Sequence, residues 1–460
     1  MSTERYDVVI LGGGPGGLAC AYALASGGVR VALVERERVG GECAFWACVP
    51  SKALLRATGP NVASKSVPGS REARAGDADF AAAAAWRTSL VSAYDDFEHA
   101  RELAAAKVAL LRGAAAIVGP GRVRVDAAEI ACETIVIATG SEDRLPPLAG
   151  LTPGRPYWTS RDASAAGEVP DRLVILGGGA VGVEFAQIFA RFGSEVTLVE
   201  PATHLLPAED PAMAELVTTH LAADGVRVRT GSKPAHVGWD EAGVQVSFEA
   251  GAPILASRLC VVTGRRPRTG DLGLETVGVT CDDRGAIAID TSCRAAGGVF
   301  AVGDVTNVAP FTHVAKYQGR IAAATILGSP AHARYDAVPR CLYTSPEVAA
   351  VGLTRAGARE RNLALLSARV DFDEVTRPVL QSEPPADGAL ELFADAERGT
   401  LVGGWIVGPF ASESMGFVTT AIVSATPLAT LLDVIQPYPT YGEAFYVAVD
   451  RLARQLRVSA

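Results

Sequence analysis

The chain has 460 residues, of which 49% are hydrophobic and 20% charged, so its composition is globular and its length exceeds one compact core. Its net charge of -9 argues against nucleic acid as the main partner, because neutralising phosphates requires a concentrated basic surface. The apolar runs are shorter than a membrane span, and the N-terminus lacks the pattern of a signal peptide. We therefore expect a cytoplasmic protein without membrane association.

The chain opens with a strand, a glycine turn, a helix and a second strand. Residues 6–11 (YDVVIL) lead into GGGPGG, then into a small-residue helix and the strand VRVALVE. The same order returns in residues 173–200, as LVIL, GGGAVG, VEFAQIFARFG and SEVTLVE. This internal repeat predicts two nucleotide-binding units in an α/β fold.

The segments between and after the repeats predict further elements. Residues 60–79, rich in small and charged residues, indicate a loose surface excursion, and residues 80–106 predict helix. Residues 123–141 predict a hairpin followed by a buried strand. Alternating segments at 244–250 and 286–290 predict more sheet, and from about residue 338 the pattern changes to that of a separate α+β domain.

Each repeat contains the glycine pattern of a dinucleotide cradle. The glycines let the backbone approach a pyrophosphate at the positive end of a helix, and an acid at the end of the next strand accepts hydrogen bonds from ribose. The first copy has Gly12, Gly14, Gly17 and Glu35, and the second has Gly177, Gly179, Gly182 and Glu200. Because Glu200 would repel a 2′-phosphate, NAD is expected rather than NADP.

Two of the eight cysteines, Cys43 and Cys48, lie five residues apart in GGECAFWACVPSK. In a regular helix this spacing exceeds the reach of a disulfide, so a bridge would require an irregular turn, which the glycines and Pro50 allow. A helix beginning near Cys48 would favour its thiolate. The stretch alone leaves a redox pair and two packing cysteines equally open.

The whole chain resembles the FAD-dependent pyridine nucleotide-disulfide oxidoreductases, which include dihydrolipoamide dehydrogenase, glutathione reductase and mercuric reductase. The resemblance rests on GGGPGG, GGECAFWACVPSK, ATGS, GGGAVGVE, TGRRP, VFAVGD, YTSPEVAAVGLT and YPTYGE, in the family's order. It implies FAD-binding segments at 1–147 and 271–337, an NAD(P)-binding domain at 148–270, and a dimerisation domain at 338–460. The implied fold is two Rossmann-like domains plus an α+β domain, in a homodimer without a resident metal.

The resemblance also implies roles for particular residues. Electrons would pass from NADH to FAD, then to a Cys43–Cys48 disulfide through Cys48, and Cys43 would attack a small-molecule disulfide. Lys52 would lie beside the flavin and pair with Glu184. Further cofactor contacts are implied for Gly41, Thr139, Gly140, Ser141, Asp304, Thr312 and His313 toward FAD, and for Gly264 and Arg265 toward the nicotinamide nucleotide.

The sequence departs from the family at the acid-base residue. The family has a histidine in HPTxxE, but here Tyr438 stands in its place, with Glu443 retained. A phenol with a pKa near 10 is a poor base at neutral pH, and acid-base assistance typically contributes about 100- to 10,000-fold. Ordinary lipoamide or glutathione turnover should therefore be weak.

Other departures surround the cysteines. Glu42 replaces a threonine and should disfavour the Cys43 thiolate by repulsion. Phe45 and Trp46 could shape a pocket or simply pack. The tail RQLRVSA has no cysteine pair for delivering mercury.

Three functions stay open at this point. The first is a disulfide reductase or dithiol oxidase that acts on a substrate with an acidic leaving thiol. The second is an NADH dehydrogenase that passes electrons from flavin directly to quinones, dyes, oxygen or a protein. The third is a flavin-carrying binding protein without significant turnover.

Overall fold

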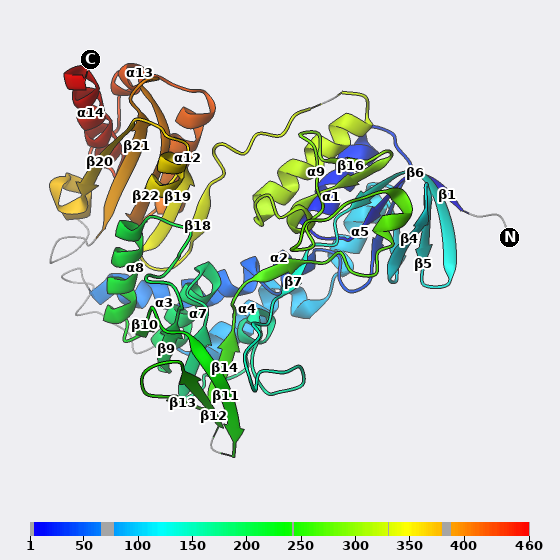
Figure 1. The fold of residues 1–460 in the computed structure, drawn as a ribbon, viewed down its shortest axis with the longest axis horizontal. Coiled ribbons are helices and arrows are strands. Elements are labelled where there is room, and N and C mark those ends of the chain that lie inside the picture. Colours follow the sequence, from blue (N-terminus) through cyan, green and yellow to red (C-terminus); the bar gives the residue numbers. More distant parts are fainter. Residues whose placement is uncertain (1–3, 66–77, 242, 330, 380–387, 460) are drawn as a thin grey trace. The chain divides into compact units, whose positions relative to one another are not determined.

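The computed structural model describes residues 4–65, 78–241, 243–329, 331–379 and 388–459. The chain forms two compact units, each built from three segments (Figure 1). Unit 1 comprises Met1–Pro50, Ala85–Arg144 and Gly264–Arg334, and unit 2 comprises Ser51–Ala84, Leu145–Thr263 and Tyr335–Ala460. Two boundaries fall within helices, α3 (Cys48–Lys65) and α4 (Phe80–Leu90).

Unit 1 is built on a sheet with the strand order β16-β17-β6-β1-β2-β3, in which β17, β6, β1, β2 and β3 run parallel. The hairpin β4-β5 continues from β6, and a short ribbon joins β7 to β15. The strands are β1 (Arg5–Leu11), β2 (Val31–Glu35), β3 (Ala109–Arg112), β4 (Ala115–Gly119), β5 (Arg122–Val125), β6 (Ala128–Ile137), β7 (Ser141–Asp143), β15 (Arg265–Pro267), β16 (Arg294–Ala296) and β17 (Val299–Ala301).

The helices of unit 1 are α1 (Pro15–Ser26), α2 (Gly41–Phe45), α5 (Phe97–Ala105) and α9 (Thr312–Ile326). Helices α1 and α9 lie side by side (Figure 1). Their backbones meet at Gly16 and Gly319, because a Cβ atom at Gly319 would lie 2.5 Å from the Gly16 carbonyl oxygen. This contact fixes α9, and with it the residues of its first turn, against α1.

Unit 2 repeats the parallel architecture in a four-stranded sheet of order β10-β9-β8-β14. A three-stranded antiparallel sheet, β11-β12-β13, belongs to the same unit. The elements of this part are α6 (Ser160–Ser164), β8 (Arg172–Leu176), α7 (Ala180–Arg191), β9 (Glu195–Val199), α8 (Pro211–Ala223), β10 (Arg227–Arg229), β11 (Pro234–Asp240), β12 (Gly243–Phe248), β13 (Ile254–Ala256) and β14 (Arg258–Val261). The unit β8-α7-β9 repeats β1-α1-β2, which confirms the predicted duplication.

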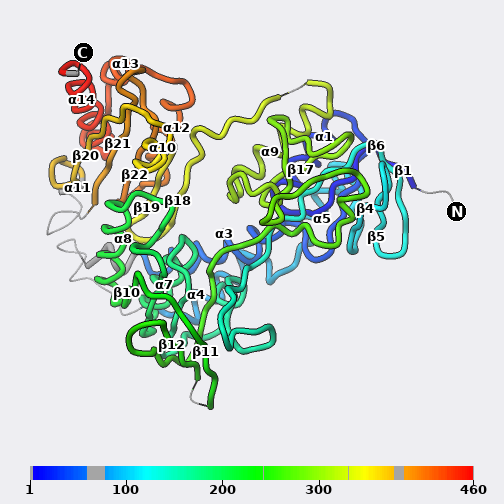
Figure 2. Tube along the Cα trace, in the orientation of Figure 1, coloured from blue at the N-terminus to red at the C-terminus, as the bar shows by residue number. Residues whose placement is uncertain are grey.

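The rest of unit 2 is an antiparallel sheet of order β18-β19-β22-β21-β20 with helices, drawn from yellow to red in Figure 2. The core between this sheet and its helices contains Leu392, Ile406 and Leu452, all fully buried. The elements are β18 (Arg340–Leu342), β19 (Glu347–Gly352), α10 (Arg355–Glu360), β20 (Leu365–Asp371), α11 (Thr376–Val379), β21 (Ala389–Asp395), β22 (Thr400–Gly408), α12 (Ala411–Val423), α13 (Leu428–Leu432) and α14 (Gly442–Ser459). The predicted fold class, two Rossmann-like domains followed by an α+β domain, is confirmed.

Three local predictions differ from the structure. Helix α3 continues to Lys65, so residues 60–65, expected in a loose excursion, are helical, and the rest of that expectation falls on residues 66–77, outside the described residues. The helix expected over 80–106 is interrupted between α4 and α5, where Ala93 has a φ of 50°. Residues 286–290 make one isolated bridge, Cys281 to Ile287, instead of a strand. Among the described residues, no helix is both long and apolar enough to cross a membrane.

Candidate active site

The first glycine cradle lies between β1 and α1. A Cβ atom at Gly17 would lie 2.0 Å from the Gly12 carbonyl oxygen, so only glycine fits there. Gly14 begins α1 without a side-chain cap, and a Cβ atom at Gly14 would meet nothing within 4 Å. The N-terminal end of α1 therefore has open space at Gly14, where a pyrophosphate would fit. The Glu35 carboxylate accepts a hydrogen bond from the Gly13 N–H (2.7 Å), which ties the loop to the end of β2.

The second cradle repeats this geometry in unit 2. A Cβ atom at Gly182 would lie 1.9 Å from the Gly177 carbonyl oxygen, whereas one at Gly179 would meet nothing within 4 Å. Gly179 begins α7, again without a side-chain cap. Glu200 is buried and accepts hydrogen bonds from the N–H groups of Gly178 and Ala202, each at 2.8 Å. Both cradles thus fit a dinucleotide in the same way.

The two cysteines lie where one helix ends and the next begins. Helix α2 ends at Phe45, and α3 begins with Cys48. Left-handed backbone at Gly40 (φ 114°) and Gly41 (φ 61°) sets the approach to α2. This irregular turn brings the Cys43 and Cys48 sulfur atoms to 2.6 Å from each other. The pair is therefore in contact, although its spacing would separate it in a regular helix.

The surroundings of Cys43 disfavour its thiolate. The hydrogen bond to Cys48 raises the pKa of Cys43 most, and burial and the charge of Cys48 raise it further, while Thr312 and Lys316 lower it. Thr312, in the first turn of α9, has its Oγ1 atom 3.4 Å from the Cys48 sulfur. The sequence predicted that Glu42 would disfavour the thiolate, but Cys48 and burial are what raise the pKa of Cys43.

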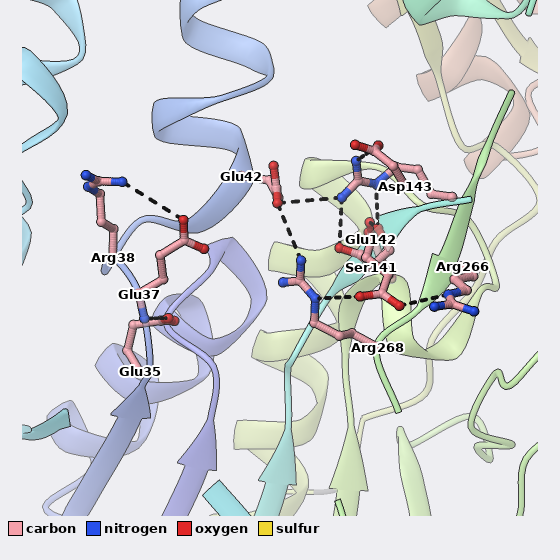
Figure 3. Close-up of polar contacts among 11 residues, drawn as sticks. Glu35, Glu37, Arg38, Glu42, Ser141, Glu142, Asp143, Arg266 and Arg268 are labelled. Atoms are coloured by element: carbon pink, nitrogen blue, oxygen red, sulfur yellow. Dashed lines mark hydrogen bonds and ion pairs between the residues drawn. The ribbon is translucent and has the colours of Figure 1, made fainter. Parts of the chain in front are cut away.

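The reason is that Glu42 is paired with two arginines. Its Oε1 atom lies 3.7 Å from the Arg265 guanidinium and 3.8 Å from that of Arg268, which Glu42 faces in Figure 3. These arginines compensate the carboxylate charge. Glu142 forms a second ion pair with Arg268, at 3.6 Å.

Arg265 also connects Glu42 to the start of β7 and, through Ser141, to η3 (Gly303–Thr306). Its Nε atom donates to Ser141 Oγ (2.7 Å), and Ser141 Oγ donates to Asp304 Oδ2 (2.6 Å). A second ion pair joins Arg265 to Asp143 at 2.8 Å. Arg265 thus belongs to the polar network of unit 1, and its expected contact with the nicotinamide nucleotide stays a prediction.

The aromatic residues between the cysteines pack against the protein. Phe45 is buried, and its ring meets that of His99 edge to face, with centroids 6.1 Å apart. The Trp46 ring stacks on Tyr94 at 4.7 Å, and Arg38 lies over its face at 5.3 Å. Of the two alternatives left open by the sequence, the structure therefore favours packing.

Lys52 and Glu184 form an ion pair in unit 2. Lys52 Nζ lies 2.7 Å from Glu184 Oε2, and Glu184 Oε1 accepts a hydrogen bond from the Tyr343 N–H (2.9 Å). The Glu184 side chain is 7% exposed and that of Lys52 33%. A buried carboxylate with two partners is unlike an ordinary surface ion pair, and it fixes the lysine ammonium in place.

Tyr438 and Glu443 meet through Thr376, at the start of α11. Tyr438 Oη and Thr376 Oγ1 are 3.0 Å apart, and the Thr376 N–H donates to Glu443 Oε2 (3.1 Å). Tyr438 is 70% exposed, so its phenol is open to solvent. Thr376 was not identified from the sequence, because it lies 62 residues before Tyr438.

The remaining predicted cofactor residues lie around the unit 1 network. Thr139 Oγ1 donates to the Arg268 carbonyl oxygen (2.6 Å), and Gly140 and Gly264 both have positive φ. His313 is exposed, and its ring stacks on Phe311. Their roles in cofactor binding stay predictions. Among the described residues, no group of three His, Cys, Asp or Glu side chains is placed to hold a metal ion.

Two glycine cradles and a pair of touching cysteines are the features of a two-nucleotide redox enzyme. Residues 6–319 match the pyridine nucleotide-disulphide oxidoreductase family, and residues 338–449 match the dimerisation domain of the same family. The chain belongs to this family. It is therefore an oxidoreductase that uses FAD and a nicotinamide nucleotide, as the family does.

Curated relatives and solved structures cover nearly the whole chain. Dihydrolipoyl dehydrogenase of Thermus scotoductus is 36% identical over 98% of both chains. Mercuric reductase of Acidithiobacillus ferrooxidans is 31% identical over 99% of this chain and 84% of its own. The HOCl-induced flavoprotein disulfide reductase RclA of Escherichia coli has a TM-score of 0.86 at 28% identity, over 97% of this chain and 99% of its own. LpdA of Mycobacterium tuberculosis has a TM-score of 0.87 at 27% identity, over 98% and 99%.

Proposed function

We propose that this protein is an NADH-dependent disulfide reductase in which Cys43 and Cys48 carry the electrons to a small-molecule disulfide. The observation that carries the proposal is the 2.6 Å contact between the two sulfurs at the start of α3. Two cysteines that served only for packing would not require an irregular turn that brings their sulfur atoms into contact. The relation to dihydrolipoyl dehydrogenases and to RclA, a flavoprotein disulfide reductase, supports the same chemistry.

In this proposal each side chain has one task. FAD, when bound, accepts reducing equivalents from the nicotinamide nucleotide and makes them available to a disulfide. Cys48, as the first residue of α3, would be the cysteine nearer that cofactor, with its thiolate favoured by the helix end. Cys43 attacks the substrate sulfur. Lys52, held by buried Glu184, provides a fixed positive charge for the cofactor.

The preference for NADH rests on Glu200. Its carboxylate is fixed at the end of β9 by two backbone N–H groups, so it occupies the position from which the family holds a ribose. A 2′-phosphate would approach this charge in a largely buried site, which is unfavourable. NADPH should therefore be the poorer donor.

The substrate is proposed to be a disulfide with an acidic leaving thiol. Thiol-disulfide exchange is faster when the departing thiol has a low pKa, and such a substrate needs little help from a proton donor. Tyr438 is open to solvent and hydrogen-bonded to Thr376, a poor replacement for a histidine base at neutral pH. Heterocyclic or strained cyclic disulfides meet this requirement.

Anaerobic thiol counting tests the proposal. NADH added to the holoenzyme should expose two new thiols per subunit, and Cys48→Ser should prevent this. Reduction of the enzyme without new thiols would reject the proposal. Steady-state rates with disulfides of graded leaving-group pKa should then rise as that pKa falls, and a flat series would reject the assigned substrate class.

One observation favours a second candidate, direct electron transfer from the flavin to a quinone-like acceptor. Contact with Cys48 and burial raise the pKa of Cys43, which lowers the fraction of reactive thiolate at neutral pH. If electrons leave without the cysteines, Cys43→Ser should retain quinone reduction and lose only disulfide reduction. Loss of both activities would exclude this candidate.

The assembly is proposed to be a homodimer formed through residues 338–449, which match the family's dimerisation domain. The family's active site borrows the stretch that contains Tyr438 and Glu443 from the partner subunit. Sedimentation should give twice the monomer mass. The domain limits at 147, 270 and 337 stay predictions that limited proteolysis can check.

A further inference from the structure

A lysine, Lys316, lies on the face of α9 that contacts the cysteine pair through Thr312. Thr312 Oγ1 lies 3.4 Å from the Cys48 sulfur, which fixes one face of α9 against the pair. Lys316 follows Thr312 by four residues in the same helix, so its side chain starts from the same face, with Cβ atoms about 5–6 Å apart. The Lys316 side chain is exposed, and the helix that carries it is held in place by its packing on α1.

The side chains that act on Cys43 or lie beside it come from several elements. Cys48 on α3 and Thr312 and Lys316 on α9 act on its pKa. Glu42 on α2 pairs with Arg265 and Arg268, and His99 on α5 packs against Phe45. Cys48 and burial raise the pKa of Cys43. Lys316 acts in the opposite direction to Cys48, because an ammonium stabilises a nearby thiolate.

We propose that Lys316 supplies a positive charge that favours the Cys43 thiolate, against the effects of Cys48 and burial, in a chain that has a tyrosine at position 438. The inference rests on the proposed function, since it gives Cys43 the role of attacking thiol. Lys316 is a positioning residue, because it acts on the ionisation of Cys43 and takes no part in the bond changes itself. It belongs to the same unit as both cysteines, so its effect requires no second subunit.

The charge assists two bond changes. In the first, the Cys43 thiolate forms a bond to one substrate sulfur, and the substrate S–S bond breaks, releasing a thiolate that takes a proton from water. In the second, the Cys48 thiolate attacks the Cys43 sulfur, restoring the protein disulfide and releasing the second substrate thiol. The two electrons come from NADH through FAD, so one disulfide, one NADH and one proton from water yield two thiols and NAD⁺.

The test measures how the reactivity of Cys43 depends on pH, independently of turnover. The full-length holoprotein with Cys48→Ser is reduced with dithiothreitol, freed of reductant and alkylated with iodoacetamide, and the Cys43 peptide is followed by mass spectrometry. The alkylation rate should rise about tenfold per pH unit up to the pKa of Cys43, because only the thiolate reacts. Lys316→Gln should raise this midpoint by about 0.5–1 pH unit, since a nearby exposed charge has a modest effect.

Matched variants separate charge from structure. Lys316→Arg should restore the midpoint, because it keeps the charge. Arg320→Gln, which removes an exposed charge one turn further along α9, should leave it unchanged. The Lys316→Gln shift should also shrink in 0.5 M salt, where the Debye length falls to about 4 Å.

The inference is overturned if Lys316→Gln leaves the midpoint of Cys43 alkylation where it is in the Cys48→Ser protein. It is also overturned if Lys316→Arg shifts that midpoint as much as Lys316→Gln does. These results are independent of the proposed function. If NADH exposes two thiols but the midpoint does not move, only the role of Lys316 fails. If the midpoint moves but Cys43→Ser retains disulfide reduction, the proposed function fails.

Discussion

The second glycine cradle permits a test in which two neighbouring glycines give opposite results. A Cβ atom at Gly182 would lie 1.9 Å from the Gly177 carbonyl oxygen, which is 1.1 Å inside the 3.0 Å minimum seen for real Cβ contacts. In Gly182→Ala, β8 and α7 must move apart, so the free energy of unfolding should fall by about 1–3 kcal/mol.

Gly179→Ala should behave differently. Its Cβ atom meets nothing within 4 Å, and the backbone (φ -74°, ψ -177°) suits alanine. Stability should be unchanged or higher by about 0.4–1 kcal/mol. The added methyl group fills the space in front of α7, so the pyrophosphate loses a charge-assisted hydrogen bond worth about 1.5–3 kcal/mol. The Kd for NAD⁺ should rise by about 10- to 150-fold.

Urea unfolding measures the free energy of unfolding of each variant. Calorimetric titration of the oxidised enzyme with NAD⁺ measures the Kd. Gly14→Ala, the corresponding change in the first cradle, is the control, because it should leave NAD⁺ affinity unaltered. The reasoning is refuted if Gly179→Ala destabilises the protein as much as Gly182→Ala does, or if it binds NAD⁺ as the unmodified protein does.

The other predictions concern charge and acid-base chemistry. Glu200→Gln keeps an acceptor for Ala202 but removes the charge, so the kcat/KM ratio for NADPH over NADH should rise by about tenfold, and an unchanged ratio would contradict the role of Glu200. Tyr438→His should raise lipoamide turnover by about 100-fold, whereas Tyr438→Phe should not raise it at all. Glu42→Gln should lower the urea unfolding free energy by at most about 1 kcal/mol, because its ion pairs are partly exposed, and should leave the Cys43 alkylation midpoint in place.

Local patterns were sufficient wherever a short segment determines its own structure. The strand, glycine turn and helix of each repeat follow from an apolar run and from backbone contacts that only glycine permits, as at Gly17 and Gly182. The segment 286–290 shows the limit of such patterns. It alternates like a strand, but the structure gives it only a single bridge, because pairing depends on a neighbour that the segment does not specify.

The environment of Cys43 could not be worked out from neighbouring residues in the chain. Sequence proximity made Glu42 the expected source of repulsion, but two arginines from the segment after residue 264 compensate its charge. Lys316 lies 273 positions after Cys43, and its nearness depends on α9 packing against α1. The one sequence signal for Lys316 was its helical spacing from Thr312, since residues four apart in a helix share a face.

The sequence by itself determined the two cradles, the cysteine pair, the order of domains and the loss of the histidine at position 438, because each is written in contiguous residues. Only the tertiary structure decided which charges reach Cys43, that Phe45 and Trp46 pack instead of lining a pocket, and that Thr376 joins Tyr438 to Glu443. Electrostatic and packing interactions act over distances in space, and the folding of distant segments together sets those distances.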